Sequence, residues 1–327
     1  MARSTEETPT HPAVGDPPWD WVTDLSLLML AVIWGVNFVV MKSVMLEVPP
    51  MALNALRFPL ASVALGFFLM GQRGPRVPRR EDVLPLIGLG VLGNVLYQLA
   101  FVFALDWTLA GNASVLLATT PMWVLILSWV MGHEAANATV ALGVAGTFGG
   151  MVMVVLGQGK SISLGAGAIR GDLLMVAAAL LWAFYTVGAR HYIMRYGSVQ
   201  VTTWTVWIGT PILILLGVPS VATLDLGAIS LPAWLGIAYA GLFSLGLAYL
   251  LWYRGVQRLG SSRTAIYSNL VPVAALTTAW IWLDEQPGAV QLSGAAVVLM
   301  GLWVARRGAG RQLPDPSSRR WRTSGNS

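Results

Sequence analysis

Apolar stretches of about twenty residues alternate with short polar connectors along most of the chain. An α-helix rises about 1.5 Å per residue, so each stretch reaches across the roughly 30 Å hydrocarbon core of a bilayer. The pattern therefore predicts an all-α integral membrane protein with ten transmembrane helices. We expect them at about 25–45, 50–70, 83–105, 111–131, 140–156, 172–192, 199–218, 233–253, 264–283 and 290–305.

Two of these stretches are near-copies of each other. The segment from Ala110 to Glu134 matches that from Ser261 to Glu285 at a constant offset of 151, so that Pro121 meets Pro272. A proline inside a membrane helix removes a backbone donor and crowds the preceding turn, which predicts a break in both copies. In the second copy the carbonyl of Ser268 would lose its usual partner and become available to a polar ligand.

The repeat extends to the two halves of the chain. Trp34 matches Trp182 at an offset of 148, and Phe101 matches Trp252 at 151. Five spans per half is an odd number, so the second half would insert upside down, as two inverted five-helix repeats. We expect a disordered cytoplasmic tail (1–22), a first repeat (23–157), a connector (158–171), a second repeat (172–305) and a basic cytoplasmic tail (306–327).

The basic residues gather on alternate connectors. With the N-terminus inside, the cytoplasmic connectors and the C-terminal tail would carry every arginine from Arg73 onward except Arg170, whereas Lys42, Lys160 and Arg170 lie on the other side. By the positive-inside rule, both termini are predicted to be cytoplasmic.

Composition excludes several other classes. With 56% hydrophobic and 11% charged residues, the chain is not a soluble domain, and its net charge of +5 lies in connectors and tails and does not indicate nucleic-acid binding. It contains no cysteine and no HExxH, GxSxG or GxxxxGK[ST] motif, which argues against an intramembrane enzyme and against ATP-driven transport. No metal or cofactor is expected. A membrane scaffold without transport activity stays open.

The run TrpGlyValAsnPhe at 34–38, LeuArgPhe at 56–58 and the paired proline-containing segments resemble the EamA-type transporters of the drug/metabolite transporter (DMT) superfamily. The resemblance covers about residues 24–306. It implies a bacterial inner-membrane exporter or permease of small metabolites, with a central cavity between the halves and alternating access. It does not identify the substrate.

Polar and aromatic side chains at helical spacing mark the expected pore face, because polar groups that lipid cannot satisfy should face protein or water. The first span has such a stripe, and so does the third span with Asn94 and Phe101 included. The alternative is that amides join neighbouring helices and aromatic rings fill gaps. The candidate substrate-binding residues are Trp34, Asn37, Phe38, Tyr97, Gln98, Trp182, Tyr185, Tyr249, Tyr267, Ser268 and Asn269.

Three charged positions need separate interpretation. Arg57 lies well inside a span, where it could hold an anionic substrate group or brace helix-end carbonyls, and we favour the brace because its repeat partner is not recognisable. For Glu134 and Glu285, at span ends, we favour a structural role such as helix capping over proton coupling.

These observations predict a secondary-active or facilitative exporter of small metabolites such as amino acids or related polar or aromatic compounds. A multidrug or cation antiporter is the alternative, although no span has an acid near its centre. The expected partners are a small-molecule substrate and the lipid bilayer. Ten spans suffice for a cavity, so a monomer is expected.

Overall fold

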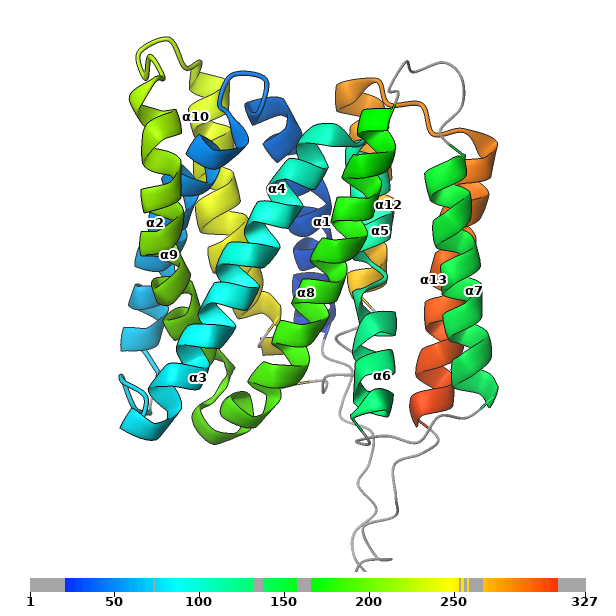
Figure 1. Ribbon diagram of the computed structural model, residues 1–327, viewed down its shortest axis with the longest axis horizontal. Helices are drawn as coiled ribbons and strands as arrows, with labels where there is room; N and C mark the ends of the chain where they lie inside the picture. Colours follow the sequence, from blue (N-terminus) through cyan, green and yellow to red (C-terminus); the bar gives the residue numbers. More distant parts are fainter. Residues whose placement is uncertain are drawn as a thin grey trace, which may run out of the picture.

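The computed structural model describes residues 21–72, 74–131, 138–157, 166–252, 254, 255, 258 and 267–310, and over these residues it contains helices and no strands. The helices lie side by side in one bundle (Figure 1). The first half contains α1 (Trp21–Val44), α2 (Pro50–Met70), α3 (Arg80–Val91), η1 (Leu92–Leu96), α4 (Tyr97–Trp107), α5 (Ala110–Leu117), α6 (Thr120–Val130) and α7 (Ala138–Leu156). The second half contains α8 (Ala166–Tyr196), α9 (Ser198–Ala222), α10 (Leu231–Ala238), η2 (Tyr239–Leu247), η3 (Ser268–Leu270), α12 (Val271–Leu283) and α13 (Ala289–Gly310).

Nine helices within the described ranges are long and apolar enough to cross a membrane. This confirms the predicted class of all-helical membrane protein. The ninth expected span, at about 264–283, begins outside the described residues, and its described part is the shorter apolar helix Ser268–Leu283. Helix α8, which contains the sixth span, starts at Ala166, before the expected start of this span at about residue 172.

Both proline positions interrupt their helices, as the sequence predicted. In the first copy α5 ends at Leu117 and α6 begins at Thr120, with Pro121 in the first turn of α6. The hydroxyl of Thr120 donates to the carbonyl of Leu117 at 2.7 Å and replaces the missing backbone donor. In the second copy a 3₁₀ turn precedes α12, and the Val271 N–H donates to the Ser268 carbonyl. The expectation of a free Ser268 carbonyl is therefore wrong, because the tighter turn supplies a donor three residues on.

A π-helical segment interrupts the third span and another interrupts the eighth. In the third span the Tyr97 N–H donates to the Leu92 carbonyl, and in the eighth the Ala248 N–H donates to the Phe243 carbonyl. These two bonds are related by the offset of 151 that relates the two sequences. Each adds a residue to one turn and changes which side chains of the following turns face inward. The hydropathy pattern gave no sign of either segment.

Helices that repeat each other in sequence also pack against each other. The crossing of α7 and α13, at the right of Figure 1, is close because glycines meet there. A Cβ built on Gly143 would lie 2.6 Å from the Gly301 carbonyl oxygen, and one built on Gly150 would lie 2.7 Å from that of Gly294. Between α2 and α9, the hydroxyls of Ser62 and Thr210 form a hydrogen bond at 2.7 Å. Small residues of this kind let membrane helices approach closely.

The remaining central contacts join one half to the other. Helix α1 packs against α12, whereas α8 packs against α4, α5 and α6. The candidate residues on α1, α4 and α8 therefore meet in the interior between the two halves.

Candidate functional site

A first aromatic group, defined by Phe38, Phe101, Tyr97, Trp182 and Tyr185, links α1, α4 and α8. Its ring centroids are 5.6 Å apart for Phe38 and Phe101, 5.8 Å for Phe101 and Tyr97, 4.8 Å for Tyr97 and Trp182, and 4.9 Å for Trp182 and Tyr185. Aromatic rings at these separations attract one another beyond simple burial. Four of these five residues were predicted site residues, and the packing brings them together with Phe101.

A second aromatic group is formed by Trp34, Tyr249 and Trp252. The Trp34 ring centroid lies 6.3 Å from that of Tyr249 and 5.8 Å from that of Trp252. The Trp34 Nε1–H donates to the carbonyl of Ser244 at 3.0 Å, inside the π segment η2. The tryptophan of the first span is therefore fixed to the eighth span by packing and by a hydrogen bond.

The two groups share two pairs of positions that the sequence repeat relates. Trp34 and Trp182 are related by the offset of 148, and Phe101 and Trp252 by 151. Trp34 comes from the first span of the first half and packs against the third span of the second half. Trp182 comes from the first span of the second half and packs against the third span of the first half. The repeat therefore places two similar aromatic surfaces across the junction between the halves.

Arg57 of α2 is buried, with only 1% of its surface exposed. Its Nε and Nη2 donate to the Asn54 Oδ1 at 3.0 and 2.9 Å, and Nη2 also donates to the Gln98 Oε1 at 2.6 Å. A buried arginine of α2 thus connects polar side chains of α2 and α4.

A methionine sulfur fills the remaining side of this cluster. The Nη1 of Arg57 donates to the Met41 Sδ at 3.0 Å, and the Nδ2 of Asn37 donates to the same sulfur at 3.4 Å. The Oδ1 of Asn37 is buried and has no hydrogen-bond partner in the structure. The expectation that Arg57 braces helix-end carbonyls is wrong, because its acceptors are side chains of α1, α2 and α4.

The other predicted residues lie further along the helices. The Tyr185 hydroxyl pairs with the Thr205 hydroxyl at 3.2 Å, on α9. The Tyr267 hydroxyl donates to the Asp24 Oδ1 at 2.6 Å, so this tyrosine is tied to the start of α1. Ser268 and Asn269 are half-buried in η3, which packs against α1.

Two polar partners of site residues were missed in the sequence, Asn54, which bonds to Arg57, and Thr205, which bonds to Tyr185. Asn54 lies one turn before Arg57 on α2, so helical spacing from Arg57 could have identified it. Thr205 lies at an offset of 148 from Arg57, the offset at which Ser62 and Thr210 pair across α2 and α9. The repeat therefore does provide a partner position for Arg57, but the residue there is neutral.

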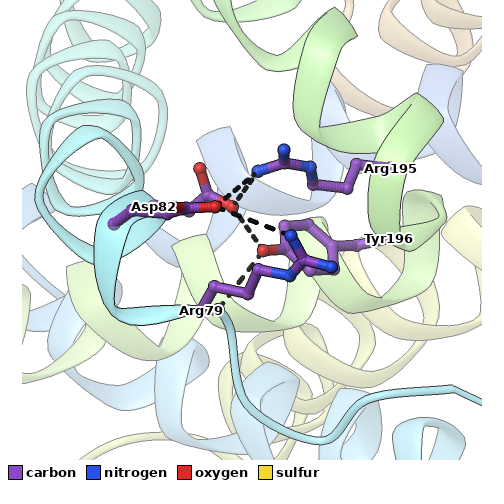
Figure 2. A network of polar contacts seen from close by, with 5 residues as sticks. Arg79, Asp82, Arg195 and Tyr196 are labelled. Atoms are coloured by element: carbon purple, nitrogen blue, oxygen red, sulfur yellow. Dashed lines mark hydrogen bonds and ion pairs between the residues drawn. The ribbon is translucent and has the colours of Figure 1, made fainter.

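Polar contacts close one end of the bundle next to the first aromatic group. Figure 2 shows Asp82 of α3 accepting from Arg195 and Tyr196 at the end of α8; the Arg195 Nη1 is 2.7 Å from the Asp82 Oδ2. The Tyr196 hydroxyl oxygen also accepts the Arg79 N–H at 3.2 Å. We call these four residues the α3–α8 network. It ties the first half to the second.

A different set of contacts closes the opposite end. The Lys42 Nζ donates to the carbonyl of Leu105 at 2.9 Å and to that of Thr108, and the Thr108 hydroxyl donates to Asp172. Lys42 therefore caps the C-terminal end of α4, where its charge favours the helix dipole.

Glu285 has a structural role, as expected, although the helix it caps belongs to the other half. Its two carboxylate oxygens accept the N–H groups of Ala110 and Gly111 at 2.9 and 3.1 Å, at the start of α5. An acid at a helix N-terminus satisfies free donors and the dipole together. Glu134, for which the same role was expected, lies outside the described residues.

A bundle of apolar helices with aromatic and polar side chains gathered between its halves is typical of a multi-pass membrane transporter. The model of the EamA-like transporter family matches residues 21–156 and 169–307, so the chain belongs to this family and to the DMT superfamily. The family and the names of the relatives confirm the predictions of a transporter and not an enzyme.

Individual relatives cover nearly the whole chain. An "Uncharacterized transporter" of Archaeoglobus fulgidus is 29% identical over 86% of this chain and 96% of its own. A "Probable terminal-alkyne amino-acid exporter" of Streptantibioticus cattleyicolor is 28% identical over 90% and 97%, and a "Probable amino-acid metabolite efflux pump" of Salmonella typhimurium is 29% identical over 85% and 92%. One solved crystal structure matches with a TM-score of 0.61 over 90% of this chain and 99% of its own, at 18% identity, which is a likeness of fold alone.

Proposed function

We propose that the protein exports small metabolites such as amino acids or related polar or aromatic compounds, by alternating access through the junction between its halves. The observation that carries this proposal is the pair of aromatic groups, in each of which the repeat-related tryptophan of one half packs against a ring of the other half. A ligand held between them would contact both halves, so rocking of the halves would expose it first to one side of the membrane and then to the other.

The proposal includes ten spans arranged as two inverted repeats. It is supported by the two separate matches of the family model, one to each half. The Ser62–Thr210 bond joins residues 148 apart, and the reciprocal meetings of Gly143 with Gly301 and of Gly150 with Gly294 are those of antiparallel helices related by a two-fold axis. Five spans per half would give this antiparallel relation, because each half would then start on the opposite side of the membrane.

The substrate class is supported by two relatives, whose names are those of an amino-acid exporter and of an amino-acid metabolite efflux pump. We infer from the arginine-rich connectors, by the positive-inside rule, that both termini face the cytoplasm, and we propose that the protein lies in a bacterial inner membrane. The site residues come from one chain, which supports a transport-competent monomer.

Transport by the purified protein in liposomes tests the proposal. We expect saturable movement of a neutral or zwitterionic metabolite from a panel of amino acids, nucleobases and cationic dyes. Tyr97→Ala and Trp182→Ala should each reduce the rate at least tenfold, because each removes a ring from the first aromatic group. Phe67→Ala is the matched control, since this ring of α2 is 65% exposed on the bundle surface.

Movement of cationic dyes alone, and only under a pH gradient, would contradict the proposal and indicate a cation antiporter. Equal loss of transport in Phe67→Ala and Tyr97→Ala would show that the aromatic groups act through stability.

A further inference from the structure

The guanidinium of Arg57 is a buried cation whose hydrogen-bond partners are all neutral. Within the described part of the chain the ion pairs involve Arg79 and Arg195, at the end of the bundle, and none involves Arg57. A charge at this depth is costly unless it is paired or faces water. The site therefore carries an uncompensated positive charge, which favours an anionic ligand.

The hydrogen bonds of Arg57 differ in strength from one edge to the other. Its Nε and Nη2 reach the amide oxygens of Asn54 and Gln98, which are strong acceptors. Its Nη1 reaches only the Met41 sulfur, and a thioether is a weak acceptor. A carboxylate oxygen at the position of this sulfur would form a charge-assisted bond, which is roughly twice as strong as a neutral one. The Nη1 edge is thus where a ligand gains most.

The Met41 sulfur lies between Arg57 and the amide of Asn37, whose oxygen has no hydrogen-bond donor. Asn37 is 6% exposed, its Nδ2 points to the same sulfur, and its Oδ1 is unpartnered. Buried amide oxygens are almost always hydrogen-bonded, so this one requires a donor. Methionine is unbranched and has three rotatable bonds, which allow its sulfur to move aside without a change in the backbone.

We propose that Arg57 and Asn37 form the head-group site of this transporter and that an α-amino carboxylate replaces the Met41 sulfur there. The carboxylate would accept from Arg57 Nη1, and the adjacent ammonium would donate to Asn37 Oδ1. In the first aromatic group, Phe38 directly follows Asn37 on α1 and Tyr97 directly precedes Gln98 on α4, so aromatic rings lie near the head-group site for the side chain of the ligand. The position equivalent to Arg57 is the neutral Thr205, so the second half offers no second head-group site. This inference rests on the proposed function, because it names the substrate class of the same site.

Four compounds with one aromatic body test the head group: L-phenylalanine, L-phenylalaninamide, 3-phenylpropionate and 2-phenylethylamine. Binding to the full-length protein in detergent is measured by calorimetry, and movement is measured separately in liposomes. We expect L-phenylalanine to bind at least tenfold more tightly than its amide, and 3-phenylpropionate more tightly than 2-phenylethylamine, because only the carboxylates use Arg57.

The variants are judged by ratios of affinities, which a partly unfolded sample does not change. Arg57→Gln should bring the phenylalanine-to-amide ratio close to one, and Arg57→Lys should restore part of it. Asn37→Leu should reduce the affinity for L-phenylalanine relative to 3-phenylpropionate severalfold, because only the former donates to Oδ1. Ser62→Ala, on the same helix as Arg57 but in the α2–α9 contact, should leave both ratios unchanged.

An unchanged phenylalanine-to-amide ratio in Arg57→Gln overturns the inference, as does wild-type protein that prefers 2-phenylethylamine or binds none of the four compounds. Transport of L-phenylalanine that does not depend on Arg57 overturns the head-group site and leaves the proposed function standing. Binding with the expected ratios but without movement in liposomes overturns the proposed function and leaves the head-group site standing.

Discussion

Single side chains in this protein join segments that are far apart in the sequence. Glu285 caps a helix of the other half, Arg57 on α2 reaches Gln98 on α4, and Trp34 bonds to a carbonyl of η2. Because membrane lipid offers no hydrogen bonds, each polar group must find such a partner inside the bundle. A buried polar atom without a hydrogen-bond partner, such as the Asn37 Oδ1, is therefore the exception that points to a ligand.

Replacement of Glu285 by alanine should destabilise the protein without changing its substrate preference. The N–H groups of Ala110 and Gly111 are buried and would lose their acceptors, at a cost of about 1–3 kcal/mol in the free energy of unfolding. Denaturant unfolding measures this change. Glu81→Ala is the control, because the Glu81 side chain is 64% exposed and a surface change of this kind costs less than about 0.5 kcal/mol. Loss of transport in Glu285→Gln at unchanged stability would instead point to proton coupling through this acid.

Glu47 should make a contribution to stability that depends on pH. Hydrogen bonds from the Ser230 hydroxyl and N–H, at 2.7 and 2.8 Å, hold the pKa of Glu47 below its ordinary value. The contact therefore stabilises the folded protein at neutral pH, and this contribution is lost as the pH falls through the lowered pKa. We expect wild-type protein to melt above Glu47→Gln at pH 7 and the difference to disappear in acid. A difference that is constant with pH would show that the carboxylate is not involved.

At the scale of elements, the two halves share their irregularities as well as their helices. The third span of each half contains a π segment, and the fourth span of each half is interrupted at the equivalent proline, Pro121 or Pro272. The π segments shift the facing of the residues that follow, among them Tyr97 and Gln98 in the first half and Tyr249 in the second. The aromatic groups thus depend on an irregular turn that precedes them.

The crossing of α7 and α13 should tolerate no side chain at its glycines. A Cβ at Gly143 would lie 2.3 Å from the Ala305 backbone nitrogen, so Gly143→Ala must push the helices apart. We expect a loss of about 1–3 kcal/mol in the free energy of unfolding, as for overpacked cores. Gly149→Ala, two turns along the same helix, is the matched control, since nothing lies within 4 Å of its Cβ position. Equal effects of the two changes would show that helix propensity and not close packing decides the result.

At the scale of the whole molecule, contacts between the halves are present at both ends of the bundle and around the central site. The α3–α8 network holds one end, and the hydrogen bond from Thr108 to Asp172 holds the other. Alternating access requires that one end open while the other stays closed, so each network must be weak enough to break in turn.

Weakening the α3–α8 network should open the end that we assign to the cytoplasm. Ala189 is buried beneath this network, and the chain contains no cysteine, so Ala189→Cys introduces a single reporter thiol. We expect a maleimide to label it severalfold faster in the presence of Asp82→Ala, because Arg195 and Tyr196 then lose their shared acceptor. Equal labelling rates would show that these contacts do not control access. Glu81→Ala serves again as the control, since its ion pair with Arg195 is exposed to solvent.

The sequence by itself determined the membrane class, the repeat, the proline breaks and most of the aromatic residues of the site. These depend on hydropathy, on helical spacing and on the missing donor of proline, which act locally along the chain. The tertiary structure decided the π segments, the side-chain acceptors of Arg57, the unpartnered oxygen of Asn37 and the helix that Glu285 caps. Each of these depends on which distant segment lies opposite, because a buried polar group bonds to whatever the packing of the two halves brings within reach.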